Sequence, residues 1–194
     1  MGGRVHAFRW TTSGPLEDIT PPGFSGAVAT DVDDAGYVAG YGWITGAEFE
    51  TQALRWAPGT GNRAVILDKG TATVINNGDA LGMDELSTTT RLWPLKGPTS
   101  QLPGPQMSYI NGLSGAGRLV GYTTANNPNP NMPWAWFNGG TTWLPVPDPT
   151  QSRVITQLHV NSCGSIVARQ RLADDSVRGL LYSKTFCDTG GNHQ

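Results

Sequence analysis

The sequence is poor in charge and in cysteine, and it has no long apolar run. Of its 194 residues, 14% are charged, with 13 basic and 15 acidic side chains. Nucleic-acid-binding proteins usually carry a basic excess on one face, so this balance excludes a nucleic-acid partner from our expectations. No stretch approaches the roughly 18 apolar residues of a membrane-spanning helix. The N-terminal residues do not show a basic segment followed by an apolar one, so we find no signal peptide in this chain.

Familiar catalytic and metal-binding motifs are also lacking. The three histidines, His6, His159 and His193, do not have the spacing of metal ligands. Glycoside hydrolases need two facing carboxylates. Adjacent pairs such as Glu17 and Asp18 would point to opposite faces of a strand. We therefore predict no catalytic residue, no metal site and no cofactor from the sequence.

A short aromatic segment occurs five times. It reads HAFRW at 6–10, QALRW at 52–56, RLW at 91–93, WAW at 134–136 and RGLLY at 178–182. Bulky residues stand two apart in most copies, and residues two apart on a strand point to one face. Each copy is therefore predicted to be a strand with one bulky face. The third copy departs from the pattern because Arg91 occupies a bulky position.

A glycine-containing segment alternates with the aromatic one. It reads VDDAGYVAG at 32–40, INNGDALG at 75–82, LSGAGRLVG at 113–121 and VNSCGSIVA at 160–168. Asp, Asn and Ser side chains bond their own backbone in turns, and glycine supplies the positive φ that tight hairpins need. The segment is therefore predicted to be a hairpin turn, with positive φ at its fixed glycines. These are Gly36, Gly78, Gly117 and Gly164.

Together with short apolar pieces between them, the two segments make a repeat of four strands. The repeat recurs roughly every 40 residues, which is typical of propeller blades. We expect one all-β repeat domain over 1–194: a small four- or five-bladed β-propeller or, alternatively, an open propeller wedge. The expected repeats are about 5–51, 52–88, 89–131 and 132–177, with a closing strand at 178–187. The repeated aromatic residues are expected to pack between repeats.

The residues His6, Ala7, Phe8 and Trp10, with the Asp/Asn-x-x-Gly-x-Val-x-Gly segment, resemble the HAF-type extracellular repeat. The resemblance spans roughly residues 5–184, although the literal His-Ala-Phe tripeptide occurs once. It implies a bacterial protein that is secreted or displayed at the cell surface, with a propeller-like architecture. The family has no established catalytic motif, so no catalytic residue is implied.

The two cysteines, Cys163 and Cys187, are predicted to form a disulfide. In an up-and-down meander, the turn that contains Cys163 and the end of the last strand lie at the same edge, with one strand between them. A Cα separation of about 5–6 Å is then within reach. The bond would hold a last strand that has no following blade.

One tryptophan outside the repeated column suggests a binding site. Trp43 opens the connection ITGAEFETQA, which contains Glu48, Phe49 and Glu50. An indole beside carboxylates suits a sugar-like ligand, because sugar rings stack on aromatic faces and carboxylates accept hydroxyl protons. The alternative is that Trp43 covers a sheet edge.

Three functions remain open from the sequence. The first is a non-enzymatic extracellular binding or adhesion module that contacts a carbohydrate or protein ligand through its inter-blade loops. The second is a polysaccharide hydrolase or lyase of the propeller type, which would need two carboxylates or a His–carboxylate pair gathered at one end of the ring. The third is a structural spacer within a larger surface protein. The fold alone does not choose among them.

Overall fold

The computed structural model consists of β-strands joined by turns. It describes residues 5–86, 89–102, 105, 108–114, 117–123, 131–137, 140–147, 152–161 and 164–182. Within these residues there are sixteen strands and no helix, so the prediction of an all-β fold is confirmed. No segment that the structure describes is therefore a helix able to cross a membrane.

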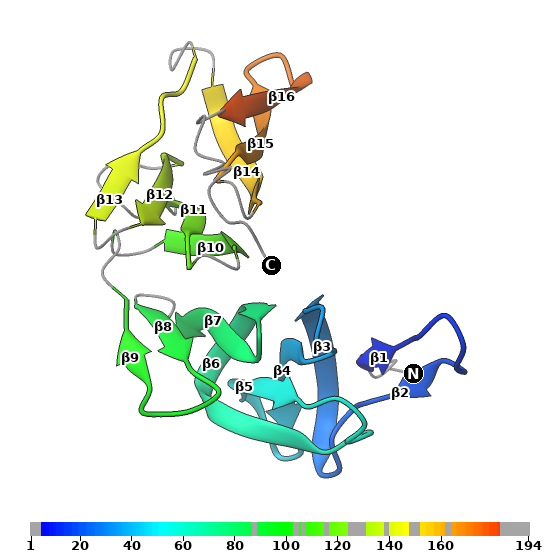
Figure 1. The fold of residues 1–194 in the computed structure, drawn as a ribbon. Helices are drawn as coiled ribbons and strands as arrows, with labels where there is room; N and C mark the ends of the chain where they lie inside the picture. Colours follow the sequence, from blue (N-terminus) through cyan, green and yellow to red (C-terminus); the bar gives the residue numbers. More distant parts are fainter. Residues whose placement is uncertain are drawn as a thin grey trace, which may run out of the picture. The chain divides into compact units, whose positions relative to one another are not determined.

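The strands follow the predicted order, with four in each repeat except the second, where the long β6 replaces two strands (Figure 1). The first repeat contains β1 (Phe8–Arg9), β2 (Glu17–Asp18), β3 (Phe24–Val32) and β4 (Val38–Ile44). The second contains β5 (Ala47–Trp56), β6 (Ala64–Asn76) and β7 (Asp79–Asp84). The third contains β8 (Thr90–Trp93), β9 (Ser100–Gln101), β10 (Ser108–Leu113) and β11 (Leu119–Thr123). The last strands are β12 (Pro133–Phe137), β13 (Gly140–Trp143), β14 (Ser152–Val160), β15 (Ile166–Leu172) and β16 (Val177–Tyr182).

Each complete sheet combines the second half of one sequence repeat with the first half of the next. Strands β3 to β9 are hydrogen-bonded in one antiparallel series, which divides at β6 into β3-β4-β5-β6 and β6-β7-β8-β9, and β10-β11-β12-β13 form a further sheet. The long strand β6 serves two sheets, because residues 64–69 pair with β5 and residues 70–76 pair with β7. Strands β1-β2 and β14-β15-β16 form smaller sheets, and no sheet of the described strands closes on itself.

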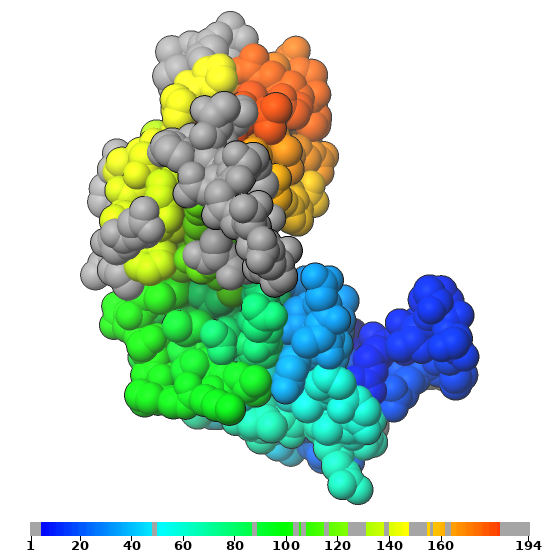
Figure 2. Space-filling view, in the orientation of Figure 1, coloured from blue at the N-terminus to red at the C-terminus, as the bar shows by residue number. Residues whose placement is uncertain are grey.

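The chain divides into two compact units. Unit 1 comprises residues 1–102 and contains β1 to β9, whereas unit 2 comprises residues 103–194 and contains β10 to β16. In unit 1 the β1-β2 hairpin projects from the larger body formed by β3 to β9 (Figure 2). That all repeats form one propeller domain stays a prediction.

The hairpin turns have the predicted backbone. All four fixed glycines have positive φ, with 84° at Gly36, 81° at Gly78, 71° at Gly117 and 81° at Gly164. The polar residue that precedes the glycine also bonds the turn as expected. In the first turn Asp33 Oδ1 accepts the Tyr37 amide at 2.8 Å. This chemistry fixes where each strand after the turn begins.

The two faces of each sheet have different partners. One face of each sheet carries Trp56, Trp93 or the equivalent residue, and we call it the aromatic face. We call the opposite face of the sheet the reverse face. Trp56 packs against Ala7 and Ile19 on the reverse face of the β1-β2 sheet, and its Nε1 donates to the Ile19 carbonyl at 2.7 Å. Trp93 packs against reverse-face residues of the β3–β6 sheet. Both indoles are buried, which confirms that these tryptophans pack between repeats.

Trp10 corrects the expectation for the whole aromatic column. It is 64% exposed, and Phe8 on the same face is 50% exposed. The β1-β2 sheet has two strands, and no described residue buries its aromatic face. A column position in the sequence therefore predicts burial only where another sheet lies against it.

Glycines after the turn make room for the indoles. A Cβ added to Gly40 would lie 2.1 Å from the Val28 carbonyl oxygen and 3.0 Å from the Trp56 ring. A Cβ at Gly121 would lie 2.7 Å from the Trp134 ring. These glycines are needed for close approach. Their recurrence with the aromatic column reflects this packing.

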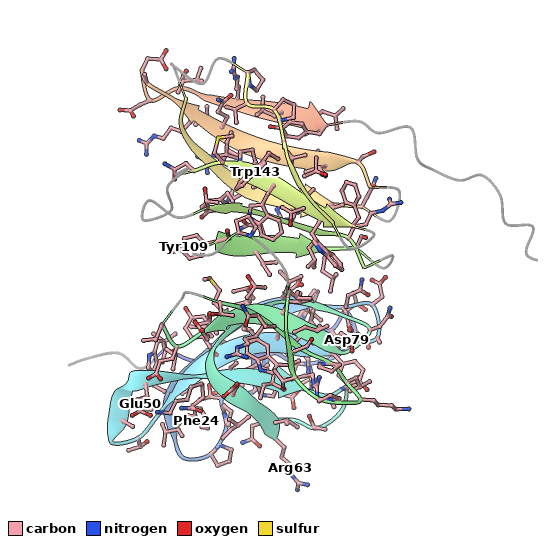
Figure 3. The ribbon with its side chains drawn as sticks, turned by 90° about the vertical axis from the view of Figure 1, so that its left-hand side faces the viewer. Phe24, Glu50, Arg63, Asp79, Tyr109 and Trp143 are labelled. Atoms are coloured by element: carbon pink, nitrogen blue, oxygen red, sulfur yellow. The ribbon has the colours of Figure 1, made fainter. Side chains whose placement is uncertain are left out.

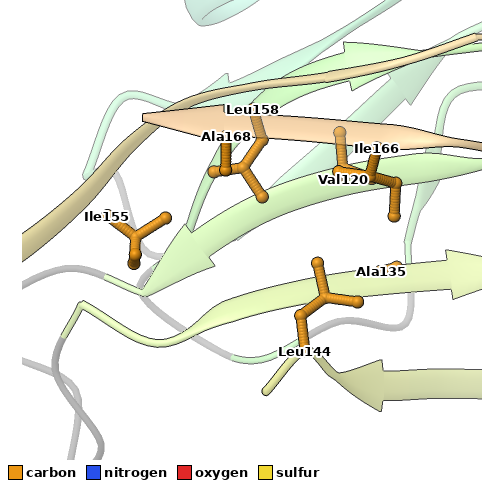
Figure 4. Close-up of a cluster of buried hydrophobic side chains, with 7 residues drawn as sticks. All are labelled: Val120, Ala135, Leu144, Ile155, Leu158, Ile166 and Ala168. Atoms are coloured by element: carbon orange, nitrogen blue, oxygen red, sulfur yellow. The ribbon is translucent and has the colours of Figure 1, made fainter. Parts of the chain in front are cut away.

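Unit 2 has one apolar core between its two sheets (Figure 4). Val120 and Ala135 contribute the reverse face of the β10–β13 sheet. Ile166, Leu180 and Tyr182 pack from the aromatic face of β14–β16. The contact thus repeats the arrangement of unit 1, with an aromatic face against the reverse face of the preceding sheet.

Candidate functional site

Trp43 lies within strand β4 rather than in a loop. It pairs with Gly26 of β3 and with Thr51 of β5. The Tyr41 ring meets the Trp43 indole edge-on at a centroid distance of 5.6 Å. The indole lies over Gly26, and a Cβ added to Gly26 would be 3.2 Å from the indole ring. The side chain is half-buried. The aromatic pair therefore has one exposed part that a ligand can reach.

The connection predicted after Trp43 is a hairpin. Thr45 and Gly46 form its turn, and β5 begins at Ala47. Glu48, Phe49 and Glu50 therefore belong to a strand, and the expectation of a long inter-repeat loop at this place is wrong. The side chains of Glu48 and Phe49 lie outside the described part of the structure.

Glu50, whose position Figure 3 shows, is bound into a surface ion network. Lys69 Nζ lies 2.8 Å from Glu50 Oε2 and 3.9 Å from Glu85 Oε2, and all three side chains are half-exposed. The hydrogen bond to Glu50, with the charges of both carboxylates, raises the pKa of Lys69. An ammonium shared by two solvated carboxylates is typical of a surface ion pair.

The structure does not bring Trp43 and Glu50 to one face. Trp43 is directly opposite Thr51, so these two side chains share a face of the β4-β5 hairpin. Glu50 precedes Thr51 by one residue, and neighbours on a strand alternate between faces. The predicted site thus provides an aromatic pair on one side and an ion network on the other.

A hollow of about 360 Å³ in unit 2 has a more aromatic lining. It lies beside β13, the edge strand of its sheet, and the end of β16. The lining residues are Phe137, Thr142, Trp143, Leu144, Pro145, Gly164, Ile166, Leu181 and Tyr182. Trp143 is 44% exposed, and Figure 3 shows its position in unit 2. Aromatic and apolar walls with few polar groups are typical of a small-ligand site.

Tyr182 lines this hollow and carries a buried hydroxyl. Its oxygen is buried and makes no hydrogen bond to the described residues. Burial raises the pKa of the Tyr182 phenol, although the charge of Arg178 acts in the opposite direction. The hydroxyl therefore stays protonated at neutral pH and can donate to an acceptor. A buried hydroxyl without a partner costs about 1–3 kcal/mol, which a ligand oxygen would recover.

His6, the first residue of the HAF tripeptide, forms a cross-strand pair. Its Nδ1 lies 2.6 Å from Asp18 Oδ2, and its ring stacks on Phe8 with a centroid distance of 6.2 Å. The Thr20 amide donates to the other carboxylate oxygen of Asp18 at 2.9 Å. Thr20 Oγ1 in turn accepts the Ala7 amide. These bonds tie β1 to β2, which gives the histidine a structural role.

The His6–Asp18 pair and the Lys69 network are the groupings that the enzyme hypothesis could use. In serine-type hydrolysis, the imidazole nitrogen that does not face the carboxylate is hydrogen-bonded to a nucleophilic hydroxyl. No described side chain is hydrogen-bonded to this nitrogen, Nε2, of His6. A glycosidase acid is kept protonated by an apolar pocket, whereas Glu50 and Glu85 are half-exposed. Within the described residues there is also no group of three or more potential metal ligands.

The predicted disulfide residues, Cys163 and Cys187, both lie outside the described residues. The sequence analysis did not assign Trp143 to a binding site. The signal that could have identified it is its setting in the polar strand GTTW, all four residues of which are exposed.

No protein-family model matches the chain, and a search of curated proteins found no match to its sequence.

Proposed function

We propose that this chain is an exported, non-enzymatic binding module built from HAF-type repeats. The resemblance of residues 5–184 to that repeat supports export and display at the cell surface. The sheet order supports propeller-like blades, because each four-stranded sheet joins two successive repeats. The binding function rests on the aromatic hollow of unit 2.

The blades form an open wedge in this proposal. In a propeller closed by strand exchange, β1 would pair with a strand equivalent to β4. The four such strands in the described structure are β4, β7, β11 and β15, and they already pair with β5, β8, β12 and β16. Closure through β1 would therefore have to displace one of them.

The observation that carries the binding function is the exposed Trp143 at the hollow. Loops and edge strands on a rigid repeat scaffold are common binding surfaces. The exposed indole offers a flat apolar face, and Tyr182, whose buried hydroxyl is a donor, lines the same hollow. A pyranose ring presents both an apolar C–H face and hydroxyl acceptors, so we propose a carbohydrate ligand.

A glycan array with the purified chain, followed by titration of the best ligand, tests this proposal. Trp143→Ala should weaken binding by about 1–3 kcal/mol, as expected for the loss of an aromatic anchor. Tyr109→Ala is the matched control, because Tyr109 is 45% exposed in the same unit and does not line the hollow. It should bind as the parent does. Equal affinity of the Trp143 variant would remove the hollow from the site.

The predicted Trp43 site is tested with the same ligand. Trp43→Ala should leave binding unchanged if the hollow of unit 2 is the contact surface. A loss with Trp43→Ala but not with Trp143→Ala would transfer the proposed site to the Tyr41–Trp43 pair. If no glycan binds, a pull-down with protein ligands decides between a protein-binding module and a spacer.

A further inference from the structure

The internal contacts of both units follow one rule. In unit 1, the aromatic face with Trp56 covers the reverse face with Ala7, and Trp93 covers Ala39 and Ala53. In unit 2, Ile166 of an aromatic face covers Ala135 of a reverse face. The contacts within the units therefore show what kind of surface an uncovered face of this fold accepts.

In the first and the last of these sheets, one face exposes apolar side chains within the described structure. The aromatic face of the β1-β2 hairpin exposes Phe8 and Trp10, together with Leu16. The reverse face of β14–β16 exposes Val167 and Leu181, which stand opposite each other in the register of β15 and β16. Val167 is 49% exposed and Leu181 is 68% exposed. Apolar clusters of this kind on otherwise polar surfaces mark interaction sites.

The charges on the two faces are complementary. Asp18 lies beside Phe8 on the hairpin, since the two residues are paired across the strands. Its ordinary pKa is lowered by the Thr20 amide and by the contact with His6, so it is ionised at neutral pH. The face on β14–β16 carries the exposed guanidinium group of Arg169 and that of Arg171, which also pairs with Asp175 at 3.3 Å. The carboxylate of one face therefore suits the guanidinium groups of the other.

We propose that the aromatic face of β1-β2 docks on the reverse face of β14–β16 in a second copy of this chain. The contact would add one more aromatic-to-reverse interface of the kind found within each unit. It joins two different surfaces, so the association is head-to-tail and can continue from copy to copy. The proposal does not rest on carbohydrate binding, because association is measured without ligand.

Sedimentation of the full chain over a range of concentrations tests the contact. The parent should form dimers and larger species as concentration rises. Trp10→Ser removes the anchor of one face, and Val167→Asp places a charge on the apolar part of the other. Each variant alone should remain monomeric at concentrations where the parent associates. Both residues are exposed, so circular dichroism should show unchanged folding.

Mixing the two variants gives the decisive result. The Trp10→Ser chain keeps an intact β14–β16 face, and the Val167→Asp chain keeps an intact hairpin face. An equimolar mixture should therefore form dimers that do not grow further. A mixture that stays monomeric, while the parent associates, would mean a symmetric contact and overturn the head-to-tail proposal.

Two further outcomes would also overturn it. The parent chain could remain monomeric at every concentration. Alternatively, the two variants could associate as the parent does. Acrylamide quenching, compared between the parent and Trp10→Ser, identifies a monomer in which Trp10 is protected. That result would mean that the aromatic face of β1-β2 is covered by another part of the same chain rather than by a second copy. Tyr109→Ser serves as the control, because Tyr109 of β10 is exposed but lies on neither docking face; it should associate as the parent does.

Discussion

The two units join their sheets by different means. In unit 1, polar side chains reach from one sheet to the next. Arg55 Nη1 donates to the carbonyl oxygens of Gly78, Trp93 and Pro94 at 2.8, 3.3 and 3.2 Å. Asp33 Oδ2 accepts the Gly78 amide at 2.7 Å. These bonds are directional, so they fix the register between the sheets as well as their contact.

In unit 2, apolar packing forms the centre of this contact, and at its edge Gln170 and Arg178 donate to the Pro147 carbonyl after β13 at 3.4 and 2.8 Å. Arg55 immediately precedes the repeated aromatic residue Trp56. In the β10–β13 sheet the equivalent residue, which precedes Trp136, is Ala135. Ala135 is buried in the cluster of unit 2 with Leu158 and Ile155. Packing of this type is strong but less directional than hydrogen bonding.

The difference shows which parts of the repeat set its geometry. The turn glycines, such as Gly36 and Gly164, have nearly equal φ in both units. The side chains on the reverse face vary between arginine and alanine without changing the order of the strands. The turns and the aromatic face therefore define the blade, and the reverse face decides how the blade is joined to the next.

The largest expected effect is the loss of Trp56. Trp56→Ala removes a fully buried indole and its hydrogen bond to Ile19, and should cost about 3–5 kcal/mol of stability. Hydrogen exchange measured by mass spectrometry should show lost protection in unit 1 and retained protection in unit 2. Trp10→Ala, an exposed member of the same column, should change the free energy of unfolding by less than about 0.5 kcal/mol. Similar losses from both substitutions would contradict the assignment of their faces.

The matching change in unit 2 is Leu158→Ala. Leu158 is fully buried in the apolar cluster, so its truncation should cost about 2–4 kcal/mol. Hydrogen exchange should now increase in unit 2 while unit 1 keeps its protection. His159→Ala changes the exposed neighbour and should leave exchange unchanged. Loss of protection in both units would show that they unfold together and would end the separation on which the comparison depends.

The sequence predicted the strands and turns well because their signals are local. An aromatic segment or an Asp-x-x-Gly turn acts within a few residues, as Asp33 and Gly36 do. The pattern also placed all four turn glycines. The β4-β5 hairpin was missed because Thr45 and Gly46 form a short turn inside a stretch that was taken as a connection. The alternating residues after Gly46 were the signal for strand β5.

The functional surfaces were harder to predict because they depend on distant residues. The exposure of Trp10 follows from which sheet lies against β1, and sequence position contains no information about that. The hollow of unit 2 combines Trp143 of β13 with Tyr182 of β16, which are far apart in the chain. Trp43 and Glu50 were close in sequence, but strand alternation separates them.

Replacing Arg55 tests the polar joint of unit 1. Arg55→Met keeps the apolar stem but leaves three carbonyl oxygens without this donor, so we expect a loss of about 1–3 kcal/mol. The acceptors are neutral carbonyl groups, so high salt should not abolish the difference between variant and parent. Chemical denaturation at low and high salt measures both points. A variant as stable as the parent would mean that apolar packing joins the sheets of unit 1 as it does those of unit 2.

The smallest expected effect compares one carboxylate from each unit. Asp18 joins two strands of unit 1 through His6 and Thr20, whereas Asp174 bonds Ser176 within a single turn of unit 2. Hydrogen bonds lower the pKa of both carboxyl groups below the ordinary 3.8, those from Thr20 foremost at Asp18 and those from Ser176 at Asp174. A lowered pKa means that the stabilisation is present above the unfolded-state pKa and is lost as the pH falls through the folded-state pKa. The effect should therefore appear below about pH 4.

Both groups are solvated, so Asp18→Asn should cost less than about 1 kcal/mol at neutral pH. Because its bonds connect β1 to β2, the variant should increase hydrogen exchange in the hairpin. Asp174→Asn should alter only its own turn. Below the folded-state pKa, the Asp18 variant and the parent should converge in stability, since the parent carboxylate is then protonated. A difference that persists in acid would assign the role of Asp18 to packing instead of charge, and equal effects of the two variants would remove the distinction between a cross-strand and a local carboxylate.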